Sequence, residues 1–316
     1  MRNLGLLGFT RPGGFRHSCK KRATPINERP SFVMPAIDHF TFGFLTPVLA
    51  YAISCTGAAT GLACTSRARA ATAGARAVWL VLGAVALGGT GIWVMHFVAM
   101  LGFSASGVEI RYDIPQTLLS AAVAIVMVGA GLFITELGKR KLPALISGGV
   151  LAGVGVAAMH YMGMAAMEMS AEIAYDFTYV AASVAVAVVA ATAALWCTVH
   201  IRGTLATTVA TLVMGIAVTG MHYTGMAGVS VVNPVDSVPA GASTMQLLVP
   251  LVMAVSVVTF LLILGIGLWP TEDELRDQMA LETRLKDQQQ VAGEASGVQD
   301  SKPLRTSQLS GAPRPY

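Results

Sequence analysis

Three short segments of the chain each carry a histidine flanked by methionines. They cover 95–100, 159–164 and 221–226 and read MHFVAM, MHYMGM and MHYTGM. In each segment the last methionine follows the histidine by four residues, so a helix places both side chains on one face. Imidazole and thioether are neutral ligands that suit copper, and the soft sulfur favours Cu(I). The candidate metal ligands are Met95, His96, Met100, Met159, His160, Met164, Met221, His222 and Met226.

These motifs lie in apolar segments long enough to cross a membrane. The 316-residue chain is 54% hydrophobic and 12% charged, whereas a soluble domain carries roughly 25% charged residues. Uncharged runs of about 20 residues, the length that spans a hydrocarbon core as a helix, recur along the chain. They fall at about 39–63, 77–101, 116–135, 143–167, 177–199, 204–229 and 247–269. We therefore predict an all-α polytopic membrane protein with about seven transmembrane helices.

The motifs recur at a nearly constant interval. Consecutive histidines are 64 and 62 residues apart, which corresponds to two membrane passes each time. The fold should therefore consist of three two-helix repeats plus one extra helix. Because the three motif segments all cross in the same direction, their histidines should lie at one depth, roughly 8–10 Å below one membrane face at 1.5 Å per residue. The sequence predicts a single Met/His cluster near that face.

The basic residues of the short loops predict an orientation, because cytoplasmic loops are enriched in Lys and Arg. Alternate loops carry Arg67, Arg69 and Arg76, then Lys139, Arg140 and Lys141, then Arg202. The loops between them are acidic by comparison. The N-terminus is therefore expected outside and the C-terminus in the cytoplasm, with the motifs near the outer face of a cell inner (plasma) membrane.

Three regions are expected along the chain. Residues 1–35 form a basic tail that should be disordered, and its positive charges would resist translocation, so Met34 is an alternative start. Residues 36–269 form the membrane domain. Residues 270–316 are expected to be a cytoplasmic tail, a short helix followed by a disordered polar end. The sequence contains no P-loop, GxSxG motif or buried carboxylate pair, so we predict neither an enzyme nor a nucleic-acid partner.

Residues 221–224 read MHYT, identical to the motif that names the MHYT-domain family of bacterial membrane sensors. MHYM at 159–162 and MHFV at 95–98 resemble degenerate copies, and the resemblance covers about 36–269. It implies copper at the Met and His residues and a diatomic gas (oxygen, CO or NO) as the sensed ligand. Many members are fused to cyclic-dinucleotide enzymes or a histidine kinase. None is recognised here, so a separate signalling partner is expected, possibly one that contacts 271–288.

Four further residues are candidates to support the ligands by hydrogen bonding. They are Tyr161, Tyr223, Thr224 and His39, although Phe97 and Val98 replace Tyr and Thr in the first motif. Asp38, next to His39, is expected to cap the first helix.

Two alternatives to a sensor remain open from the sequence. The histidines could serve only as hydrogen-bonding groups between helices of a structural membrane protein. The cluster could also belong to a metal transport or handling protein, for which Glu136, Met127 and Met214 are the candidate polar or sulfur groups in the other half of the bundle.

Overall fold

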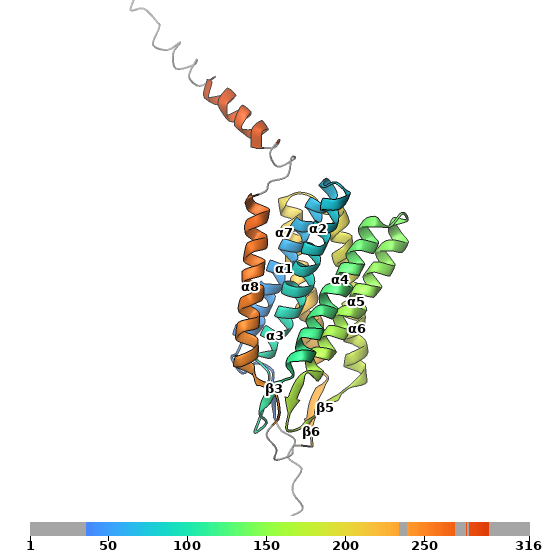
Figure 1. Ribbon diagram of the computed structural model, residues 1–316, viewed down its shortest axis with the longest axis vertical. Helices are drawn as coiled ribbons and strands as arrows, with labels where there is room; N and C mark the ends of the chain where they lie inside the picture. Colours follow the sequence, from blue (N-terminus) through green and yellow to red (C-terminus); the bar gives the residue numbers. More distant parts are fainter. Residues whose placement is uncertain (1–35, 234–238, 269–275, 277, 291–316) are drawn as a thin grey trace, which may run out of the picture. The chain divides into compact units, whose positions relative to one another are not determined.

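The structure is a computed structural model that describes residues 36–233, 239–268, 276 and 278–290, and the statements below concern those residues. Its main body is a bundle of long helices (Figure 1). They are α1 (Leu45–Ala70), α2 (Ala73–Ala84), which continues through the π-helix η1 (Val85–Val94) into α3 (Met95–Met100), α4 (Ile114–Leu137), α5 (Lys141–Ala165), α6 (Phe177–His200), α7 (Thr204–Met226) and α8 (Thr244–Leu268). Seven segments, with Ala73–Met100 counted as one, are long and apolar enough to span a membrane. The predicted polytopic all-α class is confirmed.

Large apolar side chains cover the outside of this bundle. Val189, Leu205 and Phe260 are 69%, 79% and 63% exposed. Apolar surface of this extent is not tolerated by a monomer in water, and it is the surface that lipid covers. The chain is thus a multi-pass membrane protein, and which end of the bundle faces the cytoplasm stays a prediction.

Glycines allow the helices to approach closely on the inside. A Cβ added at Gly57 of α1 would overlap the backbone of Gly91 in η1 and lie 2.8 Å from Ala86 O. A Cβ at Gly131 of α4 would lie 2.8 Å from Gly148 O of α5. Small residues at helix crossings are the usual means of packing in a membrane, where lipid offers no hydrophobic force between helices.

Short strands, where the sequence predicted only loops, gather at the end of the bundle where the motif helices finish (Figure 1). We name it the strand end. β1 (Ile37–Asp38) pairs with β2 (Ser104–Ala105), β3 (Ile110–Tyr112) pairs with β4 (Met167–Met169) and β7 (Ala242–Ser243), and β5 (Glu172–Tyr175) pairs with β6 (Val229–Val232), all antiparallel. The loops that follow successive motif helices are therefore tied to one another by backbone hydrogen bonds.

The first helix differs from its prediction at both ends. It begins at Leu45 rather than near residue 39, and Asp38 lies in β1, where its Oδ1 accepts a hydrogen bond from Phe40 N at 2.7 Å. The prediction that Asp38 caps the helix is wrong, because the helix starts seven residues later. The helix runs on to Ala70 because its basic side chains find acceptors inside the bundle. Arg67 donates to Ile266 O at 2.8 Å, and Arg69 donates to Thr198 O.

The opposite end of the bundle carries the basic residues, and we name it the basic end. They are Arg67, Arg69, Arg76, Lys139, Arg140, Lys141 and Arg202. Residues 278–290 are also helical and exposed. The predicted tail 1–35 lies outside the described residues, as do 270–275, 277 and 291–316 of the predicted tail 270–316, and the division into three regions stays a prediction.

Candidate metal centre

The structure brings His96, His160 and His222 together between the helices, in the part of the bundle nearest the strand end. They come from α3, α5 and α7, the last helix turns before the strand end. The Nδ1 atom of His96 lies 3.0 Å from Nδ1 of His222 and 3.2 Å from Nδ1 of His160. Within the described residues these histidines form the one group of at least three His, Cys, Asp or Glu side chains close enough to share an ion. The three δ-nitrogens therefore face a common point.

The cluster is shielded from solvent. The three imidazoles are 1%, 1% and 2% exposed, and their ring centroids are 4.9–5.1 Å apart with interplanar angles of 74–85°. Each ring also meets the following aromatic residue of its own motif edge-on, at 4.8 Å for Phe97, 4.9 Å for Tyr161 and 5.0 Å for Tyr223. The crowded aromatic shell limits how far each ring can rotate.

The donor set fits a metal ion. Three nitrogens bound at about 2.0–2.1 Å to one ion would lie about 3.3–3.6 Å apart. The two separations from His96 Nδ1, 3.0 and 3.2 Å, are a few tenths of an ångström shorter, and one nitrogen from each of the three rings lies within 4.8 Å of the others. Three neutral imidazoles also avoid the cost of placing a ligand charge in the membrane. The buried group could therefore hold a metal ion.

Two of the outward-facing ring nitrogens meet glycine rather than a hydrogen-bonding group. Nε2 of His96 and Nε2 of His160 are buried and have no hydrogen-bond partner among the described residues. A Cβ at Gly163 would lie 2.5 Å from the first, and a Cβ at Gly225 would lie 2.7 Å from the second. Each of these rings thus packs on the motif glycine of the next repeat. The glycine sets the ring position by leaving room for it.

Gly163→Ala should therefore disturb the cluster without removing a ligand. The new methyl group would push the His96 ring and turn its Nδ1 away from the shared point. Changes outside the ligands typically lower metal affinity by about 10–100-fold, and we expect a loss in that range, measured by competition with a chromophoric copper(I) chelator. Gly220→Ala is the matched control, because nothing lies within 4 Å of its added Cβ. Equal affinity in the two variants would contradict this role.

The six predicted methionine ligands are all buried. Met100, Met164 and Met226 lie one helical turn beyond the histidines, toward the strand end, and are 3%, 0% and 2% exposed. The leading methionines, Met95, Met159 and Met221, are equally buried. Their sulfurs would offer soft ligands around the imidazoles, and their role as ligands stays a prediction.

The hydroxyl groups predicted to support the histidines point elsewhere. Tyr161 OH shares a 2.7 Å hydrogen bond with Ser183 Oγ of α6, and Thr224 Oγ1 donates to Gly220 O at 2.7 Å. Tyr223 OH is buried with no partner among the described residues. The tyrosines therefore contact the histidines through their rings, as Phe97 does in the first motif without a hydroxyl.

His39 lies before α1, at the strand end. Its ring is 5.6 Å from that of Phe103, and burial lowers its pKa although the neighbouring Asp38 acts in the opposite direction. The side chain is thus half-buried and more often neutral than an exposed histidine.

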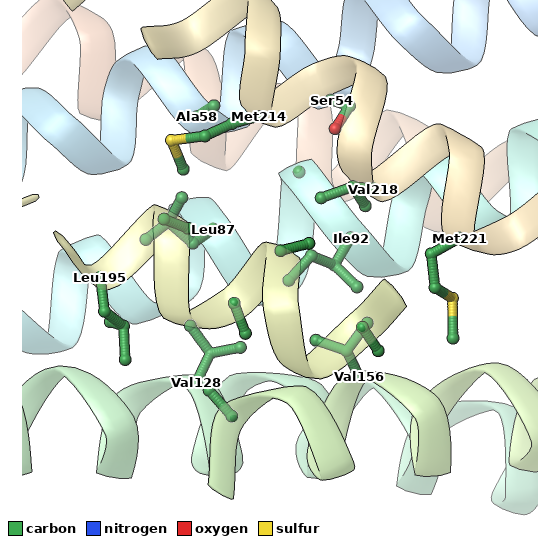
Figure 2. A pocket seen from close by; sticks show the side chains of 16 residues that line it. Ser54, Ala58, Leu87, Ile92, Val128, Val156, Leu195, Met214, Val218 and Met221 are labelled. Carbon is green, nitrogen blue, oxygen red and sulfur yellow. The ribbon is translucent and has the colours of Figure 1, made fainter. Parts of the chain in front are cut away.

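An apolar cavity of about 50 Å³ lies one helical turn from the cluster, on the side of the basic end. Ile92, Val156 and Val218, each four residues before a cluster histidine, line one part of it beside Met221 (Figure 2). Ser54 contributes the single hydroxyl among its lining residues. The volume exceeds the roughly 10–15 Å³ that one water requires, and apolar cavities of this kind stay dry and accept small apolar molecules. Sequence reasoning did not identify this cavity, because its walls come from six separate helical segments.

Glu136, Met127 and Met214 were the candidates for a transport path through the bundle. No chain of polar side chains joins them to the histidine cluster in the described residues. Met214 lines the apolar cavity. Glu136 lies at the basic end, where its Oε1 is 3.5 Å from Arg69 Nη1. Met127 packs against Gly155 on α5. The described residues between the histidines and the basic end thus present an apolar space to an ion.

Comparisons with known proteins place these features in a family. The MHYT repeat, described as a bacterial signalling protein N-terminal repeat, matches residues 89–148, 153–211 and 215–275. Each match begins within a motif helix and runs through the helix that follows, which confirms the three two-helix repeats and leaves α1 as the extra helix.

Three curated relatives are signalling proteins. The chain is 44% identical over 47% of its length to the bifunctional diguanylate cyclase/cyclic di-GMP phosphodiesterase MucR of Pseudomonas aeruginosa. It is 36% identical over 61% of its length to the cyclic di-GMP phosphodiesterase NbdA of the same organism, and 33% identical over 69% to an uncharacterized signaling protein of Caulobacter vibrioides.

The matched parts cover only 22%, 24% and 26% of these relatives. No solved structure matches the chain. The family matches extend over more than half of the chain and include all three histidine motifs. The chain therefore belongs to the MHYT family of bacterial signalling-protein repeats.

Proposed function

We propose that this protein is a membrane sensor module that binds one copper ion through His96, His160 and His222. The observation that carries this proposal is the convergence of three buried δ-nitrogens, with separations of 3.0 and 3.2 Å, from the three repeats. The Nδ1 atom of His96 is in hydrogen-bonding contact with both other imidazoles, and a single ion at that position would bridge all three rings.

The surroundings favour copper over a harder metal. The donors are neutral imidazoles, and buried thioethers lie one residue before and four residues after each of them. Soft sulfur and imidazole together suit Cu(I), whereas Mg²⁺, Ca²⁺ and Mn²⁺ prefer oxygen ligands. When bound, copper would supply a binding position for a diatomic gas and a one-electron redox change. The chain's own part is to hold the three rings in a dry, crowded shell.

The apolar cavity supports a diatomic gas (oxygen, CO or NO) as the sensed ligand. Its walls reach to within one helical turn of all three histidines through Ile92, Val156 and Val218. A space of about 50 Å³ without charged groups admits a small apolar molecule and disfavours a hydrated ion. For the same reason we favour a sensor over a metal transporter.

A signal can leave the cluster through the helices that carry it. The three histidines lie on α3, α5 and α7, so any change in their separation shifts these helices relative to one another. The paired strands join the loops that follow the same helices, so they move as a unit. The two Pseudomonas aeruginosa relatives are named for enzymes that make or degrade cyclic di-GMP, and we propose that this module controls an enzyme of that kind on a partner chain.

The test is infrared spectroscopy of the purified chain after copper(I) loading under reducing conditions and addition of carbon monoxide. We expect about one copper per chain and a carbon monoxide stretching band. Val156→Phe should keep the copper and lose most of the band, because its ring occupies the cavity. Val154→Phe is the control, because Val154 lies on the same helix but is 45% exposed. Failure of the parent protein to retain copper would refute the proposal. An unchanged carbon monoxide band in Val156→Phe would show that the gas does not occupy the cavity.

A further inference from the structure

An open groove runs along the lipid-facing side of α5 and α6. It has a volume of about 450 Å³ and is lined by Leu145, Val188, Val189, Thr192, Ala193 and Trp196. The lining residues of α6 span about 12 Å at 1.5 Å per residue. The Thr192 hydroxyl is turned inward to Val188 O at 2.7 Å, so the groove offers an apolar surface. Its length and chemistry match part of a lipid acyl chain.

A second pocket of about 200 Å³ continues this groove at the basic end. It shares Leu145 and Trp196 with the groove and adds the exposed polar residues Lys141 and His200. The pocket thus gathers polar groups where the apolar groove ends. This is the division between head and tail that an amphiphile presents.

Lys141 is the cationic group of the pocket that a ligand can reach. It is exposed and makes no ion pair within the described residues, and the neighbouring Glu136 is paired with Arg69 at 3.5 Å. Thr135 also lines the pocket, but it is 2% exposed and its Oγ1 lies against Gly148 of α5, so it shapes the wall and offers no hydroxyl to a ligand.

Trp196 and His200 form the rigid wall of the pocket. Their rings are stacked at 4.9 Å with an interplanar angle of 17°, and His200 Nδ1 donates to Trp196 O at 3.0 Å. That hydrogen bond leaves His200 Nε2 directed away from its own helix. Tryptophan is favoured at the level of lipid headgroups because its ring is amphipathic.

The charge around the pocket is positive. Lys139, Arg140 and Lys141 lie between α4 and α5, and Arg202 follows α6. Glu136 is the acidic residue near them and is already paired. Basic pockets between transmembrane helices at a membrane face bind anionic lipid headgroups. A zwitterionic headgroup would place its own cation against the same positive charges.

We propose that this groove is a binding site for an anionic phospholipid. The headgroup phosphate binds Lys141 beside His200, and one acyl chain lies along α5 and α6 against Trp196. The α5–α6 pair carries the second histidine motif, so a bound lipid would brace one of the three motif helices. The site is distinct from the histidine cluster, and its existence does not depend on metal binding.

The test compares phosphatidylglycerol with phosphatidylcholine on the detergent-purified chain by native mass spectrometry. We expect preferential binding of phosphatidylglycerol, and an affinity about five-fold lower in Lys141→Gln, the effect of one basic residue near a membrane surface. Lys141→Arg should retain the preference. Arg140→Gln removes an equal charge from the neighbouring turn and should have a smaller effect. Equal losses in Lys141→Gln and Arg140→Gln, or no preference in the parent, would overturn the proposal.

A second measurement locates the lipid through tryptophan fluorescence. Phosphatidylglycerol with brominated acyl chains should quench more strongly than brominated phosphatidylcholine at the same mole fraction in nanodiscs. That excess should vanish in Trp196→Phe and persist in Trp79→Phe. Trp79 is the matched control because it lines a groove of about 240 Å³ between α2 and α8, where the nearby Arg67 is buried and donates to Ile266 O. Excess quenching that survives in Trp196→Phe would place the lipid elsewhere.

Discussion

Replacing His160 by Ala should lower the affinity for copper(I) by about 100-fold or more. His160 supplies one of three converging nitrogens, with its Nδ1 3.2 Å from that of His96. Groups outside the ligand shell already contribute about 10–100-fold to metal affinity, so the loss of a ligand must reach or exceed the top of that range. Competition with a chromophoric copper(I) chelator measures the affinity, and elemental analysis of the purified protein measures the retained metal.

His200→Ala is the matched control for this experiment. It also removes one imidazole from the end of a span, but His200 is exposed at the basic end and bonds to Trp196 O. We expect unchanged copper binding. If His160→Ala binds copper as tightly as the parent and only unfolds more readily, the histidines serve as hydrogen-bonding groups between helices. That outcome would support the structural alternative over the sensor.

Gly57→Ala should destabilise the bundle more than Gly163→Ala or Gly220→Ala. The added Cβ would overlap the backbone of Gly91, and Ala86 O would lie 2.8 Å away. Over-packing typically costs about 1–3 kcal/mol, and we expect the upper end of that range because backbone atoms cannot rotate aside. The free energy of unfolding, measured by denaturant titration in mixed micelles, should fall accordingly.

Gly220→Ala is the control for this experiment and should not destabilise the bundle. It lies in α7 with nothing within 4 Å of an added Cβ, and alanine is a better helix former than glycine by roughly 0.5–1 kcal/mol. Its unfolding free energy should stay constant or rise slightly. Comparable destabilisation of the two variants would mean that the close approach of α1 and η1 does not determine stability.

The position of Gly57 also links stability to the site. Gly91, which it contacts, lies in the π-helix η1 immediately before the motif helix α3. A π-helix has more residues per turn than an α-helix, so it changes the direction in which the following residues face, and such segments frequently occur at functional sites. The close packing at Gly57 thus helps to fix the direction in which His96 points.

The three repeats contribute equivalent histidines but unequal surroundings. His96 and His160 pack on Gly163 and Gly225, whereas the first motif has Ala99 at the corresponding place. The first motif also follows a π-helix, and the other two lie within continuous α-helices. The cluster therefore has approximate rather than strict threefold character.

Much of the architecture was predictable from local sequence. Seven apolar runs fixed the number of spans, since only a helix satisfies its backbone within one segment in lipid. The boundary of α1 was not predictable, because the helix extends through Arg67 and Arg69. Those side chains are satisfied by Ile266 O and Thr198 O, which are distant in the chain. The short strands were not predictable for the same reason, because each pairs with a segment that is distant in the chain.

Residue spacing and helix period are local properties, and they were enough to place three histidines at one depth in a three-repeat membrane bundle. They do not show that Nδ1 of His96 faces the δ-nitrogens of His160 and His222, that Gly163 and Gly225 receive the rings, or that an apolar cavity lies one turn away. Those features depend on how helices rotate and approach in three dimensions, because each is formed by side chains from different repeats.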